Sequence, residues 1–159
     1  IKQCLVGSEM CIRDSNQVVR IRNPKSTRPW QHVLEPLRGY LILAQKLTLD
    51  HEKYSSSFNF GPFEDDIKSV EWIVEKMSEY WVDSKWDIDK MQNPHEEVNL
   101  SLDIEKASKL LGWKPYWNIE QTIESIVEWH QCFDEKPDNI RDYSINEIES
   151  YLKDTRTYE

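Results

Sequence analysis

Apolar residues recur at steps of three and four in several stretches of the chain, the spacing that places side chains on one face of an α-helix. The first such stretch is formed by Val33, Leu37, Tyr40, Leu41, Ala44 and Leu47. Pro36 fits a helix only in its first turn, so this helix starts near residue 33. A second stretch covers 67–81, where Val70, Ile73, Val74, Met77 and Trp81 share a face. Both patterns predict amphipathic helices.

Capping residues predict two further helices. Asp103 can cap a helix over 104–111, which Gly112 ends in a left-handed conformation. Asn118 can cap a helix over 119–133, whose apolar positions again lie near one face. The last residues, 134–159, carry eight Asp or Glu against four Lys or Arg. We expect them to form an acidic tail with a peripheral helix over 145–153.

Alternation of apolar and polar residues predicts short strands between these helices. Strands are expected at 18–21, at 86–88 and at 98–102. The aromatic segment 58–60 precedes Gly61 and Pro62, which predicts a buried strand entering a turn. Short strands together with four to five helices predict an α/β fold in one domain, bounded by residues 16 and 133.

Composition narrows the possible partners. Apolar residues make up 38% of the 159, with seven Trp, which is enough for a globular core. The net charge of -9 argues against nucleic-acid and anionic-membrane partners. No apolar run approaches the roughly 18 residues that cross a bilayer. Three cysteines predict neither a disulfide framework nor a metal site, so a cytoplasmic location is expected.

Residues 1–15 differ from the rest of the chain, because they show no helical or strand periodicity. They resemble a translated sequencing-adapter segment. We therefore expect this stretch to be non-native and to lie outside the folded domain, with different residues in the natural protein.

The stretch 28–37, RPWQHVLEPL, carries the most distinctive chemistry. A guanidinium fork at Arg28 matches two adjacent phosphates, and the following helix N-terminus adds positive potential. No acidic residue occurs from Gln17 to Leu34. These features predict diphosphate recognition. Glu35 is explained without a ligand, because a carboxylate stabilises the first turn of a helix.

The stretch RPWQHVLEPL is followed by Asn59 in FNFGP and by His95-Glu96 before LSLD. In this order the motifs resemble the CDP-glucose 4,6-dehydratase family, extended short-chain dehydrogenase/reductase enzymes that act on nucleotide sugars. The resemblance runs from about Val18 to about Phe133. It implies that 16–133 form the C-terminal, substrate-binding part of such an enzyme, with CDP-glucose as the ligand.

The resemblance also implies the site residues. Arg28, Asn59 and His95 are the main candidates for substrate binding, and Gln31 and His32 are weaker ones. Asn59 can alternatively close the turn at Gly61, and His95 can be a surface loop residue. Relatives have an Arg three residues before this His, where the chain has Gln92.

A whole enzyme of this kind would be a lyase that uses NAD as a transient hydride acceptor. The chain has only four glycines, and none are close enough to form a pyrophosphate-binding turn. No Tyr is followed four residues later by Lys, the catalytic pair of the family. We therefore expect the NAD-binding Rossmann half to be largely missing. The chain is then expected to contain no catalytic residue and to be inert alone. It is also expected to expose apolar surface. The whole enzyme is expected to be a homo-oligomer.

Two alternatives remain open from the residues. The chain can belong to another nucleotide-sugar epimerase or dehydratase. It can also be a small acidic helical module that binds a protein partner and no small molecule.

Overall fold

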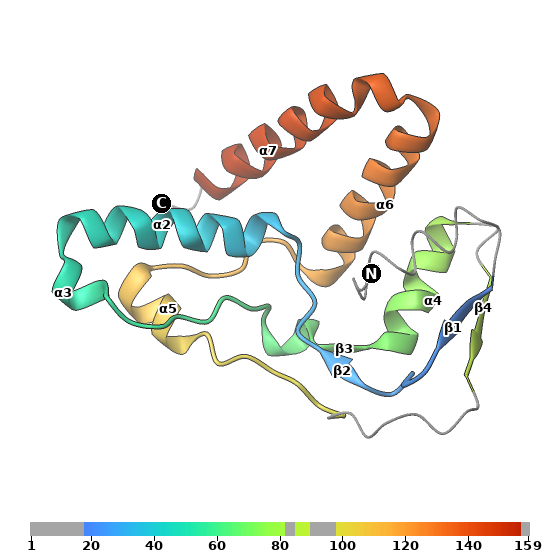
Figure 1. The fold of residues 1–159 in the computed structure, drawn as a ribbon, viewed down its shortest axis with the longest axis horizontal. Coiled ribbons are helices and arrows are strands. Elements are labelled where there is room, and N and C mark those ends of the chain that lie inside the picture. The colour runs from blue at the N-terminus through green and yellow to red at the C-terminus, as the bar shows by residue number, and fades with distance from the viewer. Residues whose placement is uncertain (1–17, 82–84, 90–97, 157–159) are drawn as a thin grey trace, which may run out of the picture. The chain divides into compact units, whose positions relative to one another are not determined.

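The computed structural model describes residues 18–81, 85–89 and 98–156, which form two compact units (Figure 1). Unit 1 contains the described residues of Ile1–Arg28 and Lys68–Leu100, and unit 2 those of Pro29–Ile67 and Ser101–Glu159. The domain limits expected at residues 15 and 133 stay predictions.

Unit 1 holds the strands. Its elements are β1 (Val19–Ile21), β2 (Thr27–Arg28), β3 (Lys68–Ser69), α4 (Val70–Tyr80) and β4 (Trp86–Ile88). Strands β1 and β4 pair in parallel, and β2 and β3 pair antiparallel, giving two separate two-stranded sheets in the described part of the chain. The strands predicted near 18–21 and at 86–88 are confirmed.

Unit 2 is mainly helical. Its elements are α2 (Leu34–Leu49), α3 (His51–Tyr54), η1 (Glu64–Asp66), α5 (Glu105–Leu111), α6 (Ile119–Glu135), η2 (Pro137–Asn139) and α7 (Ile140–Arg156). Helices α6 and α7 form a hairpin (Figure 1). The five predicted helices are present among the described residues, and α3 is an additional short helix that Asp50 caps. The predicted class, helices with short strands, is confirmed.

The geometry of the helix ends confirms the caps predicted at Asn118 and Gly112. Helix α5 begins one residue later than predicted, with Ile104 rather than Asp103 as its N-cap. The Asn118 side chain accepts from the Gln121 backbone N–H, and the Gln121 side chain accepts from that of Asn118, a complete capping box. Gly112 ends α5 with φ of 71°. Asp103 Oδ1 accepts from the backbone N–H of Glu105 at 2.8 Å.

Two predicted strands are wrong. Residues 58–60 form no strand. The Phe60 carbonyl accepts from the Gln31 side chain, and the Asn59 side-chain amide donates to the Asp103 carbonyl. These polar groups therefore bond outside a strand ladder. In 98–102 only an isolated bridge joins Asn99 to Thr27. The apolar residues of 58–60 serve packing rather than a strand ladder.

The last helix is longer than predicted. It runs over Ile140–Arg156 instead of 145–153. Its Tyr151 is 2% exposed, and the Tyr151 ring meets the rings of Tyr116 and Trp117 edge-on. The C-terminal helix therefore takes part in the packing of unit 2.

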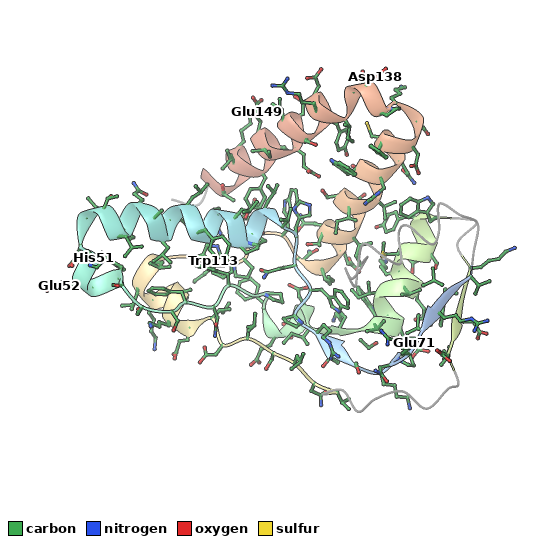
Figure 2. All side chains as sticks on the ribbon, in the orientation of Figure 1. His51, Glu52, Glu71, Trp113, Asp138 and Glu149 are labelled. Carbon is green, nitrogen blue, oxygen red and sulfur yellow. The ribbon has the colours of Figure 1, made fainter. Side chains whose placement is uncertain are left out.

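The core of unit 2 is an aromatic and aliphatic cluster of Tyr54, Phe60, Ala107, Leu111 and Trp113. Phe60 and Trp113 pack edge-to-face with centroids 4.9 Å apart, a geometry that aromatic quadrupoles favour. One face of α2 covers this cluster with Ile42, Leu43 and Leu47. Figure 2 shows Trp113 among the side chains beneath α2. No helix in the described ranges is long and apolar enough to cross a membrane.

Gly39 offers a test of this packing. A Cβ at this position would lie 2.5 Å from two carbons of the buried Phe60 ring. Overpacking of this kind costs about 1–3 kcal/mol, which exceeds the roughly 1 kcal/mol that alanine gains over glycine in a helix. We expect Gly39→Ala to lower the free energy of unfolding in urea. In a Phe60→Leu background the same change should be neutral or stabilising, and an equal loss in both backgrounds would contradict the packing described.

Candidate functional site

Gln31 lies in the segment that leads into α2. Its Nε2 donates to the Phe60 carbonyl at 2.7 Å. Its Oε1 is buried and has no hydrogen-bond partner within the described residues. A buried amide with one oxygen unpaired is costly, because that atom has lost its water. Gln31 is therefore anchored at one end and offers an acceptor at the other.

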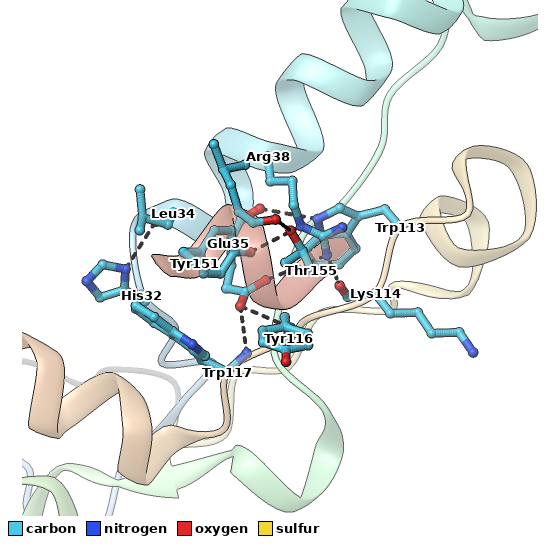
Figure 3. Close-up of polar contacts among 11 residues, drawn as sticks. His32, Leu34, Glu35, Arg38, Trp113, Lys114, Tyr116, Trp117, Tyr151 and Thr155 are labelled. Atoms are coloured by element: carbon cyan, nitrogen blue, oxygen red, sulfur yellow. Dashed lines mark hydrogen bonds and ion pairs between the residues drawn. The ribbon is translucent and has the colours of Figure 1, made fainter. Parts of the chain in front are cut away.

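His32 is 5% exposed and lies two residues before the first residue of helix α2 (Figure 3). Its Nδ1 accepts from the backbone N–H of Leu34 at 3.3 Å, and its ring meets the Trp117 ring edge-on at 4.9 Å. Burial lowers the pKa of His32 from 6.5 to about 4. The imidazole is therefore neutral near pH 7 and brings no positive charge to a phosphate.

Asn59 is exposed, and its Nδ2 donates to the Asp103 carbonyl at 3.2 Å. The next residue, Phe60, accepts the hydrogen bond from Gln31. The Gln31 side chain thus contacts the short segment of unit 2 that carries Asn59. Asn59 also links that segment to the start of α5.

Arg28 lies in β2 of unit 1 and is half-buried. One guanidinium nitrogen, Nη1, donates to the Thr27 carbonyl at 2.8 Å and contacts the Val98 carbonyl at 3.5 Å. Arg28 and Asn59 belong to different units, and His95 lies outside the described residues. The convergence of Arg28, Asn59 and His95 on one ligand stays a prediction.

Glu35 forms a buried contact that the sequence analysis does not anticipate. Its carboxylate is fully buried, and Oε1 accepts from the backbone N–H groups of Tyr116 at 3.0 Å and Trp117 at 2.7 Å (Figure 3). Its backbone carbonyl accepts from Trp113 Nε1 at 3.2 Å. Glu35 therefore fastens the segment 113–117 to the start of α2, in addition to stabilising that helix end.

Arg38 extends this contact to α7. Its Nε donates to the Tyr151 hydroxyl at 3.1 Å, another of its nitrogens donates to the Lys114 carbonyl, and its guanidinium lies 4.0 Å from Glu35 Oε2. Burial, followed by the nearby Glu35 carboxylate, raises the pKa of Tyr151. The phenol stays protonated at physiological pH. Only the pairing of Glu35 with Arg38 one helical turn later could have hinted at this cluster in the sequence.

Unit 2 has at least two hollows among its described residues. One, of about 520 Å³, lies between α6 and α7 and is lined by Glu124, Glu128 and Glu147 among others. Burial raises the pKa of Glu147. The other, of about 560 Å³, is lined by Arg38 and Lys114 among others. Neither hollow is lined by Arg28, Gln31, His32 or Asn59.

The described residues do not fit a dinucleotide. Gly39 lies inside α2, Gly61 lies in a loop and Gly112 ends α5, so none occupies a strand-to-helix turn where a pyrophosphate binds. Within the same residues no three His, Cys, Asp or Glu side chains are grouped to hold a metal ion.

The buried carboxylate gives a stability prediction. Glu35→Gln keeps one acceptor but removes the charge beside Arg38, so we expect a loss of about 1–3 kcal/mol in the free energy of unfolding. Glu105, in the first turn of α5, is the matched control because its side chain is 67% exposed and bonds only Lys109 in the contacts described. Glu105→Gln should change stability by less than about 0.5 kcal/mol. If urea titrations show the same loss of unfolding free energy for both variants, the buried contact of Glu35 described above is contradicted.

His32 gives a pH prediction. Its pKa is lower in the folded state than in the unfolded state, so the unfolded chain binds the proton more tightly. The stabilising contribution is complete above about pH 6.5 and is lost as the pH falls toward 4. The wild-type chain should lose free energy of unfolding when the pH falls from 7 to 4.5. We expect His32→Asn, which keeps a hydrogen-bond acceptor, to make that loss smaller by roughly 2 kcal/mol. The exposed His51 supplies the control: His51→Asn should leave that loss unchanged in unfolding titrations.

No family model matches the chain. CDP-glucose 4,6-dehydratase of Salmonella typhimurium (strain LT2) is 46% identical over 143 residues, which covers 89% of the chain and 40% of the relative. The chain therefore spans about two fifths of the length of this curated relative. The predicted resemblance is confirmed: the chain is homologous to part of a CDP-glucose 4,6-dehydratase.

Proposed function

We propose that the chain is the substrate-binding portion of a CDP-glucose 4,6-dehydratase. The observation that carries this proposal is the 46% identity to the Salmonella enzyme over 143 residues. In this proposal the chain holds and orients CDP-glucose, while acid, base and hydride groups come from residues that the chain does not contain. The whole enzyme converts CDP-glucose to CDP-4-keto-6-deoxyglucose and water.

Arg28 is the proposed diphosphate ligand. Its guanidinium is held by backbone carbonyls of Thr27 and Val98, which restricts the plane of the fork. A planar, always charged fork suits paired phosphate oxygens better than a lysine does. Ordering the guanidinium before the ligand arrives lowers the entropy cost of binding.

Gln31 and Asn59 are the proposed ligands for neutral polar groups of the nucleotide sugar. The unpaired Gln31 Oε1 can accept from a hydroxyl or an amino group, which would remove the cost of its burial. His32 is neutral and bonded to the start of α2, so its contribution is to position Gln31 rather than to bind phosphate. His95 completes the proposed set.

NAD belongs to the whole enzyme in this proposal. Bound NAD would supply a transient hydride acceptor, which would allow water to be eliminated without net redox change. The glycines of the described residues offer no turn for its pyrophosphate, so the proposal places NAD on the remainder of the enzyme.

Calorimetric titration of the chain with CDP-glucose tests the role of Arg28. We expect Arg28→Ala to weaken binding by about 10- to 100-fold, because charge-assisted hydrogen bonds contribute about 1.5–3 kcal/mol. Arg22 is an exposed arginine of the same acid-free stretch and serves as the matched control. Arg22→Ala should change the Kd by less than about threefold.

The same titration separates the alternatives. Equal affinity for CDP and UDP would point to another nucleotide-sugar epimerase or dehydratase. No heat with CDP-glucose, CDP or UDP would contradict small-molecule binding and favour a protein-binding module.

A further inference from the structure

The two hollows described for unit 2 differ in the sign of their charge. The hollow between α6 and α7 is lined by three glutamates, and its described lining residues include no Lys or Arg. The hollow of about 560 Å³ has the opposite lining, two cations and no Asp or Glu among its described residues. In a chain of net charge -9 such a lining is an exception. We call it the Arg38 hollow, and its main lining residues are Arg38, Phe63, Lys114, Pro115, Tyr116 and Gln121.

Three side chains of the Arg38 hollow supply hydrogen-bond donors. Arg38 bonds the rest of unit 2 through Nε and Nη2, which leaves Nη1 without a partner in the described residues. The Gln121 Oε1 accepts from the Asn118 backbone N–H at 3.1 Å, so the Nε2 amide group is left to donate. The exposed Lys114 side chain extends away from the backbone (Figure 3), and its flexible stem lets the ammonium turn toward an anion. Donors without a carboxylate in the same lining favour an oxyanion ligand.

The charge balance of the hollow limits the kind of anion. Glu35 Oε2 lies 4.0 Å from an Arg38 guanidinium nitrogen and offsets the charge of that side chain. Lys114 forms no ion pair with the residues that the structure describes. About one positive charge is therefore left over, which suits a singly charged carboxylate better than the diphosphate of CDP-glucose.

The apolar walls of the hollow leave room for more than an ion. Phe63 is 47% exposed and lines the hollow together with Pro115 and Tyr116. The volume of about 560 Å³ lies within the roughly 300–1,000 Å³ of small-molecule sites. An aromatic wall beside fixed donors is the usual composition of such sites.

We propose that the Arg38 hollow binds a small carboxylate that carries an apolar ring. Arg38 and Lys114 bind the carboxylate, and Phe63 contacts the ring. The Arg38 guanidinium is already held in place, which lowers the entropy cost of binding. This site is separate from the proposed function, because the described residues proposed to bind CDP-glucose do not line the hollow.

NMR titration of the chain with benzoate and with acetate tests the site. We expect benzoate to shift the backbone amide resonances of Lys114, Tyr116 and Gln121. Acetate lacks the ring, so it should bind at least about threefold more weakly than benzoate. Phe63→Ala should remove this difference by weakening benzoate binding alone. An equal Kd for the two anions in the wild-type chain would overturn the ring contact.

Variants at Lys114 test the charge. Lys114→Gln should weaken the binding of both anions by about tenfold, because a charge-assisted hydrogen bond is lost. Lys114→Arg keeps the charge and should retain binding. Lys136 is an exposed lysine of the same unit that lines neither hollow, so Lys136→Gln is the matched control and should bind benzoate like the wild-type chain. Both substitutions replace exposed side chains, and thermal melting checks that the variants stay folded.

Three results overturn the proposal. The first is the absence of benzoate-dependent shifts at the three amides, and the second is an equal Kd for Lys114→Gln and Lys136→Gln. The third is tighter binding of inorganic phosphate than of benzoate, which would contradict the carboxylate class.

Calorimetric titration with CDP-glucose in saturating benzoate keeps this site apart from the proposed function. We expect the Kd for CDP-glucose to stay unchanged, because the two ligands occupy different sites. Competition between them would overturn the separate site. A chain that binds benzoate but not CDP-glucose would contradict the proposed function alone.

Discussion

The buried Glu35 carboxylate is the contact on which the arrangement of unit 2 depends. It accepts two backbone hydrogen bonds from the segment 116–117 and lies beside Arg38, which reaches Tyr151 of α7. A fully buried carboxylate is tolerated only where such partners exist, because its desolvation otherwise costs several kcal/mol. The need of Glu35 for hydrogen-bond partners therefore holds α2, the segment after α5 and the C-terminal helix together within unit 2.

The same contact explains how the start of α2 is held. His32 lies against Trp117, whose backbone Glu35 binds, and Gln31 reaches the Phe60 carbonyl in the core. The residues ahead of the helix are thus fastened from two sides. A rigid segment of this kind is a suitable support for binding groups, because ligand binding then requires little ordering. With Glu35 and Arg38 fastened inward, Val33, Leu37 and Leu41 on the other side of α2 stay exposed.

Local chemistry predicted the elements and their ends well. The capping box at Asn118 and the left-handed Gly112 arise from residues within one turn of each other, so they can be read without the fold. Strands were predicted less well. Residues 58–60 and 98–102 have strand-like composition, but a strand needs a partner, and the partner is set by distant parts of the chain. The C-terminal helix was predicted to be peripheral for the related reason that Tyr151 finds Arg38 only in the folded unit.

The sequence by itself determined the helices, their caps, the α/β class and the similarity to the dehydratase, because these depend on spacing and on the order of short motifs. It also pointed to exposed apolar surface without saying where. Only the tertiary structure decided which face of α2 is buried, since Glu35 meets its partners 81 and 82 positions along the chain. Only the fold makes His32 neutral, because burial lowers the pKa of its imidazole. That burial comes from packing between segments that are distant in the sequence.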